Sequence, residues 1–171
     1  MTCFQKLVGP ALALTLLAGC QSLMPTASPQ AVLEARSGSS VTGTVSFTPS
    51  AQGMVVSATI KGLKPNAEHG FHVHEKGDCS APDAMSAGGH FNPHGAAHGA
   101  PGSPAHAGDM PNLRADASGT AVYKATVSGL SLTGMHGVMG LSVAVHRDPD
   151  DYRSQPAGNS GARVACGVIK S

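Results

Sequence analysis

The chain has 171 residues, a formal net charge of +1, 22 glycines, 12 prolines and 9 histidines, and it contains no tryptophan. Its length suits one domain once any targeting segment is removed, and the near-neutral charge without a long basic run argues against nucleic-acid binding. Because glycine and proline are poor residues for helix interiors, the composition favours an all-β domain with many turns over a helical bundle.

The first segment of the chain has the features of an export signal. Residues 7–19 are mostly apolar and too few to span a bilayer, but they have the length of the apolar region of a secretory signal. A buried core helix is the alternative, and Pro10 within the run argues against it. The last residues of the run, Leu17–Cys20, resemble the cleavage box of bacterial lipoproteins. This resemblance implies that residues 1–19 are a signal peptide and that Cys20 carries a lipid.

The lipoprotein resemblance also implies a location. In such signals an aspartate directly after the cysteine marks retention in the inner membrane, whereas this chain has Gln21 there. We therefore expect a protein of the bacterial periplasm, anchored to a membrane through the lipid on Cys20, with the outer membrane preferred.

The four cysteines can then be assigned. Cys3 is removed with the signal peptide and Cys20 is taken by the lipid, which leaves Cys79 and Cys166 in an oxidising compartment. These two are predicted to form a disulfide. In the chain-entropy model a bridge that closes so long a loop contributes on the order of 4 kcal/mol.

The segment after the lipidated cysteine has no sustained hydrophobic period. Residues 21–37 contain Pro25, Pro29 and small polar residues. We therefore expect residues 20–38 to be the lipidated cysteine with a flexible linker, and residues 39–171 to be the folded domain.

Alternation with a period of two residues indicates the strands of this domain. Between Gly53 and Lys61, and again between Thr120 and Val127, apolar residues recur at every second position, the pattern of a half-buried strand. Turn signals such as Lys64–Asn66 separate the strand segments. The predicted strands are Val41–Phe47, Gly53–Lys61, Gly70–His74, Thr120–Val127, Val138–His146 and Arg163–Ile169.

Two long stretches, Lys76–Pro111 and Arg147–Ala162, do not fit the strand pattern. A loop of such length in a compact domain is usually functional or disordered, so an ordered one needs something to order it. The first stretch is rich in residues that bind metals: His90, His94, His98, His106 and Asp109. A bound metal is the obvious means of ordering this loop.

The histidines fall into two groups that suit metal ions. His72 and His74 are one residue apart in a predicted strand, so both imidazoles project from the same face. A surface location without a metal is the alternative for this pair. Three imidazoles and one carboxylate form a closed tetrahedral shell that suits structural zinc, while imidazoles with an open position suit redox copper. The candidate zinc group is His90, His98, His106 and Asp109.

Two motifs at opposite ends of the domain resemble those of one protein family. Gly70–Cys79 is similar to the copper-binding strand of the copper/zinc superoxide dismutases, and Gly158–Ile169 is similar to their C-terminal signature. The similarity extends from about Ser39 to Ser171. It implies an all-β fold, a Greek-key β-sandwich or flattened barrel of immunoglobulin-like architecture, with long metal-binding and active-site loops.

Applied residue by residue, the resemblance implies two metal ions that share one ligand. Copper would be bound by His72, His74, His90 and His146, and zinc by His90, His98, His106 and Asp109. Asp150 resembles the carboxylate that accepts a hydrogen bond from one ligand of each metal, with a turn residue as the alternative. Arg163 resembles the arginine beside the open copper position. The resemblance implies no metal ligand at His69, His94 or His136.

The implied activity is the dismutation of superoxide to dioxygen and hydrogen peroxide, with His90 and Arg163 as the catalytic residues. The lysine and acidic residues that guide substrate in some relatives are not evident, and Arg147 and Arg153 are candidates to replace them. Two alternatives are a lipoprotein that stores metal and a structural or copper-delivery module. The presence of Arg163 argues against the first, and the complete ligand set argues against the second. The sequence leaves open whether the chain is a monomer or a homodimer.

Overall fold

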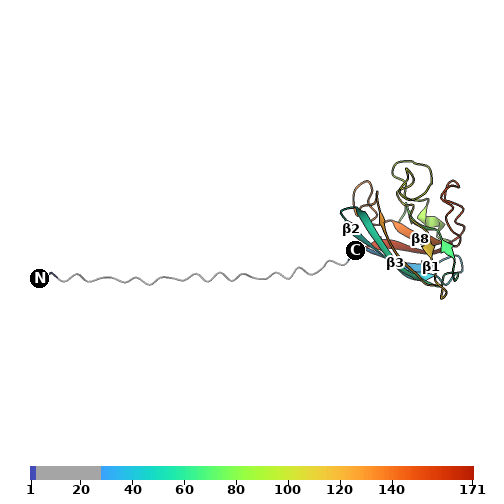
Figure 1. Cartoon of the computed structure of the whole chain (residues 1–171), viewed down its shortest axis with the longest axis horizontal. Coiled ribbons are helices and arrows are strands. Elements are labelled where there is room, and N and C mark those ends of the chain that lie inside the picture. Colours follow the sequence, from blue (N-terminus) through green and yellow to red (C-terminus); the bar gives the residue numbers. More distant parts are fainter. Residues whose placement is uncertain (3–27) are drawn as a thin grey trace.

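The computed structural model describes residues 1–2 and 28–171, which include a single β-rich body (Figure 1). Residues 3–19 of the predicted signal peptide, Cys20 and the first part of the predicted linker lie outside the described residues. Among the described residues no helix is long and apolar enough to cross a membrane.

Nine strands and one short 3-10 helix make up the described fold. They are β1 Gln30–Ala35, β2 Thr42–Ser50, β3 Gly53–Lys61, β4 Glu68–His69, β5 Phe71–His74, η1 Met85–Ala87, β6 Leu113–Arg114, β7 Ala121–Val127, β8 Ser142–His146 and β9 Arg163–Lys170. Seven strands form one antiparallel sheet in the order β5-β8-β9-β1-β2-β3-β7, and β4 pairs with β6. The predicted all-β class is confirmed.

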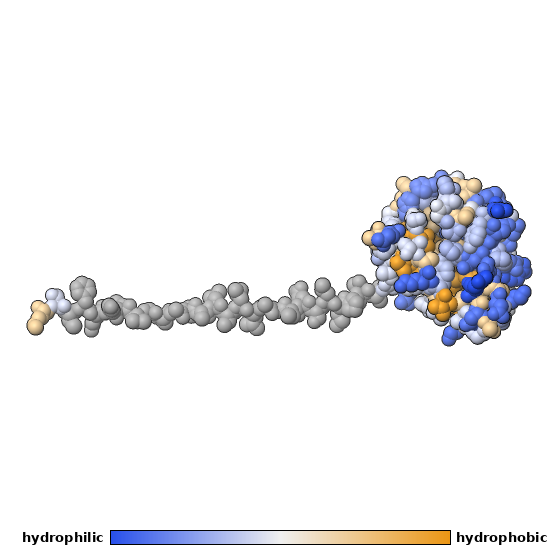
Figure 2. Space-filling view, in the orientation of Figure 1, coloured by the Kyte–Doolittle hydropathy of each residue, from blue (hydrophilic) through white to orange (hydrophobic). Residues whose placement is uncertain are grey.

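The core lies inside the curl of the large sheet. In β3 the residues at every second position are buried, as the alternation predicts. Their side chains pack with apolar residues from the other strands and from the loops into one cluster, whose largest fully buried members include Phe47, Phe71, Leu33, Ile60, Leu113 and Ile169. On the face shown in Figure 2, hydrophobic residues form small separate patches among hydrophilic ones, as is usual for a folded domain.

The prediction of a flexible linker is wrong for Gln30–Ala35, which forms β1. This strand pairs with β2 on one side and β9 on the other, so the folded body begins before residue 39. Ala31 and Leu33 are buried, whereas Val32 is 66% exposed. Apolar and polar residues alternate over only a few positions directly after Pro29, so the local pattern does not indicate a strand. The pairing with β2 and β9, which are distant in sequence, decides that this segment is a strand.

One further prediction needs correction, and two short strands were not predicted. The strand predicted over Val138–His146 begins only at Ser142, because Gly140 adopts a turn with φ of 79° and donates its N–H to the carbonyl of Ile169. Strands β4 and β6 were not predicted, since two residues are too few to show a period.

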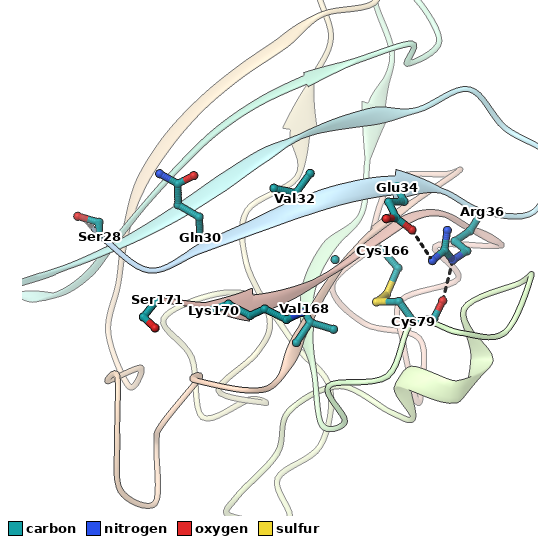
Figure 3. A pocket seen from close by; sticks show the side chains of 11 residues that line it. Ser28, Gln30, Val32, Glu34, Arg36, Cys79, Cys166, Val168, Lys170 and Ser171 are labelled. Atoms are coloured by element: carbon teal, nitrogen blue, oxygen red, sulfur yellow. Dashed lines mark hydrogen bonds and ion pairs between the residues drawn. A yellow bond between two sulfur atoms is a disulfide. The ribbon is translucent and has the colours of Figure 1, made fainter. Parts of the chain in front are cut away.

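The two long loops lie side by side against the sheet. Loop 75–112 and loop 147–162 run next to each other in Figure 1, and Gln155 joins them by accepting a hydrogen bond from His98 N and donating one to His98 O. The predicted disulfide is confirmed: Cys79 in the first loop is bonded to Cys166 in β9, with Cα atoms 5.7 Å apart. Figure 3 shows this bond, with Arg36 Nε donating to the carbonyl of Cys79 at 2.8 Å. The loop that carries most of the candidate ligands is therefore fixed to the sheet at its beginning.

Candidate metal centre

Strands β5 and β8 bring three histidines together. Within β5, His72 and His74 lie on the face opposite Phe71 and Val73, and all four residues are buried. β8 pairs with β5, and an irregularity in the pairing of β8 with β9 occurs between Val145 and His146. Such bulges redirect a side chain. The Nε2 atoms of His74 and His146 lie 3.3 Å apart.

His90 comes from the loop but is held against β5 by backbone contacts. It forms an isolated bridge with His74, and the residues on either side of it extend this pairing: Glu75 N donates to Gly89 O, and Phe91 N donates to Val73 O. Its ring stacks on that of His72, with centroids 3.9 Å apart. The structure thus groups His72, His74, His90 and His146, with one possible ligand atom from each lying within 4.8 Å of all the others.

A second group shares His90 with the first. His90, His98, His106 and Asp109 also offer ligand atoms that all lie within 4.8 Å of one another. His90 Nδ1 lies 2.7 Å from an oxygen of Asp109, and the Nδ1 atoms of His98 and His106 lie 3.0 and 3.3 Å from the same carboxylate. These two groups are the copper set and the zinc set predicted from the sequence.

Buried imidazole nitrogens in both groups make no hydrogen bond, although two of them lie close to the carboxylate of Asp109. They are His72 Nδ1, His90 Nε2, His98 Nδ1 and His106 Nδ1. Leaving a buried polar atom unpaired is costly, and an ion is one of the few ways to satisfy several such atoms at one place. The Nδ1 atom of His90 faces Asp109 in the second group, and its unpaired Nε2 atom is available to the first group. The donor sets fit four-coordinate zinc and imidazole-bound copper.

Asp150 connects the two groups through one histidine of each. Its two carboxylate oxygens accept hydrogen bonds from His72 Nε2 at 2.8 Å and from His98 Nε2 at 2.9 Å. With both Nε2 atoms protonated, the Nδ1 lone pair of each ring is left for a metal. The amide of Asn112 holds Asp150 in turn, donating to its carbonyl and accepting from its N–H.

Burial favours the neutral form of His72, His74 and His146. Burial lowers the pKa of His72 and His74 well below the usual histidine value, and neighbouring histidines lower it further. Burial and the adjacent His90 lower the pKa of His146 to about 3. Burial by itself would raise the pKa of Asp109, but the hydrogen bond from His90 and the nearby imidazoles hold it below its usual value. Neutral imidazoles and an ionised carboxylate are the forms that bind metals.

Arg163 lies beside the first group at the start of β9. Its guanidinium donates hydrogen bonds to the carbonyls of Ala84 and Gly88, which fixes its orientation. It lines a hollow of about 410 Å³ with His146 and an adjoining hollow of about 530 Å³ with His90. A fixed positive charge therefore lies at the opening to the copper set.

The remaining sequence candidates lie outside the two groups. His69 is buried, with Nδ1 2.9 Å from the carbonyl of His146, and His94 lies close to His136 on the surface. Arg147 forms an ion pair with Asp148 at 2.8 Å, which weakens its field as a guide for an anion.

The sequence analysis did not identify Asn112 and Gln155, which hold Asp150 and His98 in place. Their roles depend on contacts between loops, which leave no pattern along the chain.

Comparisons with known proteins all identify relatives of one family. Residues 41–169 match the family model described as copper/zinc superoxide dismutase (SODC). The chain is 44% identical over 125 residues to superoxide dismutase [Cu-Zn] 2 of Aquifex aeolicus, covering 69% of this chain and 72% of the relative. It is 42% identical over 144 residues to superoxide dismutase [Cu-Zn] of Deinococcus radiodurans, covering 77% and 78%.

A solved structure is similar as well. A double mutant of a SOD-like protein from Bacillus subtilis superposes with a TM-score of 0.76 at 37% identity, over 83% of this chain and 97% of that one.

Proposed function

The chain belongs to the copper/zinc superoxide dismutase family, and from this we propose that it dismutates superoxide in the bacterial cell envelope, using a copper ion and a zinc ion that share His90. The enzyme class and the use of both metals follow from family membership. The assignment of individual residues and the location are our proposals. The observation that carries the residue assignment is that one histidine belongs to both buried groups.

We assign the metals by the chemistry of the donors. His72 Nδ1, His74 Nε2, His90 Nε2 and His146 Nε2 would hold copper. His90 Nδ1, His98 Nδ1, His106 Nδ1 and an oxygen of Asp109 would hold zinc. When bound, copper supplies the one-electron redox chemistry by which one superoxide is oxidised and the next is reduced, whereas zinc has no redox chemistry in proteins.

The chain supplies the proton and the orientation. His90 Nε2 would take up one proton when the enzyme is reduced and donate it to the second superoxide, and a second proton from water completes hydrogen peroxide. Nδ1 of the same ring stays on the zinc side, so that the ring keeps its place while Nε2 is protonated. Asp150 holds His72 and His98 in the tautomers that leave Nδ1 free.

Arg163 attracts the substrate. Superoxide is a small anion, and a cation at the opening of a low-dielectric hollow raises the rate at which such an anion arrives. The two hydrogen bonds to backbone carbonyls keep the guanidinium at that opening.

The shared imidazole can be tested by loading copper(II) into both sites. A deprotonated ring between two copper(II) ions couples their electron spins, so we expect the unmodified protein to lose most of its ordinary copper(II) EPR signal. Because His90→Gln removes the bridge, any copper(II) that this variant holds should give an uncoupled signal. Two independent copper signals in the unmodified protein would refute the bridge.

For the location, we propose that residues 1–19 are cleaved as a signal and that Cys20 is lipidated, with the protein facing the periplasm. The resemblance of Leu17–Cys20 to a lipoprotein cleavage box supports this proposal. The disulfide between Cys79 and Cys166 supports export, since such bonds persist in oxidising compartments.

The anchor can be tested with two matched cysteine variants. Cys20→Ser should abolish incorporation of a labelled fatty acid and release the protein from membranes or leave it unprocessed. Cys3→Ser, in the segment that we expect to be cleaved off, should leave membrane attachment unchanged. Membrane fractionation with normal retention of Cys20→Ser would contradict the lipid anchor.

A further inference from the structure

Two histidines that belong to neither buried group face each other across two loops. His94 is an exposed residue of loop 75–112, and His136 lies in the segment between β7 and β8. Their Nε2 atoms are 3.2 Å apart, and their ring centroids are 4.8 Å apart. The two positions are 42 residues apart in sequence, so the fold alone creates this pair.

The tautomer of His136 leaves its facing nitrogen with a lone pair. His136 Nδ1 lies 2.8 Å from the carbonyl of Gly129, so Nδ1 carries the proton and donates it. In a neutral ring Nε2 is then an acceptor. A histidine that donates one ring N–H to a backbone carbonyl and presents the other nitrogen outward has the arrangement typical of a metal ligand.

The distance between the two Nε2 atoms suits two ligands of one ion. With metal–nitrogen bonds of 2.0–2.1 Å and ligand angles between 90° and 109°, the two nitrogens of a bound pair are separated by about 2.9–3.4 Å. The observed 3.2 Å lies within this range. The alternative is one shared proton in an N–H···N hydrogen bond, which metal binding would displace.

Local hydrogen bonds fix the backbone that carries each histidine. The side chain of Asn92 donates to Ala96 O and accepts from Ala96 N, which closes the turn that carries His94. On the other side, Ser131 N donates to His136 O at 2.9 Å. The pair is therefore largely preformed, which reduces the entropy lost when a ligand binds.

The surroundings favour a cation. The two histidines line a hollow of about 470 Å³ together with His106, Asp109, Thr126 and Ser128, and no lysine or arginine of the described chain is among the lining residues. Water or nearby hydroxyl groups can complete the coordination. His106 and Asp109 belong to the zinc set, so this hollow adjoins the buried zinc site.

We propose that His94 and His136 form a third metal site, an exchangeable one on the surface, which binds a divalent first-row transition metal through two imidazole nitrogens. By the general order of affinities, Cu²⁺ should bind more tightly than Ni²⁺ or Zn²⁺. Alkaline-earth cations should not compete, because they prefer oxygen ligands. This inference does not depend on the proposed catalytic mechanism.

Nickel provides a probe that is chemically distinct from the two resident metals. We expect the copper- and zinc-loaded protein, dialysed against Ni²⁺, to take up one additional metal per chain by elemental analysis. His94→Gln and His136→Gln should each lose this uptake while their copper and zinc contents stay unchanged. Met135→Leu, which changes the exposed neighbour of His136 and keeps both rings, is the matched control and should retain it. A low concentration of Cu²⁺ should displace the nickel from the unmodified protein.

The copper and zinc contents of each variant report whether it has folded, so a loss of nickel alone identifies the surface site. Absence of nickel uptake in the unmodified protein would overturn the proposal. Nickel uptake by the two glutamine variants at the level of the unmodified protein would overturn it as well. Missing copper or zinc in the unmodified protein would instead count against the proposed function, so the two failures are distinguishable.

Discussion

Single residues outside the two ligand groups decide how the ligand side chains are oriented and how an anion reaches them. Asp150 makes one contact with each group, and Arg163 lies at the opening with its guanidinium fixed by two carbonyls. The backbone near Asp150 is also restricted: Gly158 has a φ of 64°, and a Cβ built there would lie 1.8 Å from Asp150 Oδ1. The site therefore depends on residues that bind no metal.

Replacing Arg163 by glutamate should lower the second-order rate of dismutation by about tenfold or more, because an attractive potential at the opening becomes repulsive. Metal content should stay the same, since Arg163 is not a ligand. Lys124→Glu on β7 makes the same change in net charge elsewhere and should have little effect. Pulse radiolysis at low and high salt measures both rates, and a full rate in Arg163→Glu would refute the role of this residue.

Replacing Asp150 by asparagine should weaken both metal sites. An amide has one acceptor oxygen and cannot accept from the Nε2–H groups of both His72 and His98 as the carboxylate does. Loss of such a partner typically costs 10–100-fold in metal affinity. Competition with a chelator measures this, and Asp151→Asn, at the exposed neighbour, is the control. Equal affinities in the two variants would contradict the bridging role.

At the scale of elements, β1 is the strand that the sequence pattern did not predict. It supplies Leu33 to the core while Val32 faces solvent, and it lies between β2 and β9 in the large sheet. Leu33→Ala should therefore lower the free energy of unfolding by about 2–5 kcal/mol, and Val32→Ala by roughly 0.5 kcal/mol or less. Urea unfolding measures both values. Neutral effects of both substitutions would mean that Gln30–Ala35 behaves as the linker that the sequence suggested.

At the scale of the whole molecule, the buried histidines make the metal-free protein sensitive to acid. In the unfolded chain a histidine has a pKa of about 6.5, whereas burial lowers the pKa of His72 and His74 in the fold and lowers that of His146 to about 3. The unfolded state therefore binds more protons below about pH 6.5, so stability present above that pH is lost as the pH falls towards the lower folded values.

Urea unfolding of the metal-free protein at about pH 7.5, 6 and 4.5 should show this decline, with the steepest loss below the unfolded histidine pKa. His146→Gln removes one of the three groups and should make the decline shallower. Stability that is constant or that increases on acidification would contradict the expectation.

The sequence by itself determined what depends on short-range pattern. Alternation identified β3 and β7, the spacing of His72 and His74 placed them on one face, and the motifs Gly70–Cys79 and Gly158–Ile169 indicated the family. The resemblance carried by these motifs also implied that His90 is shared by two metals and that Asp150 contacts a ligand of each. The order of the sheet, the position of β1 and the pairing of His94 with His136 were decided by the tertiary structure alone. The physical reason is that these contacts join residues far apart in the chain. Their geometry follows from how strands pair and loops pack, and no local period encodes it.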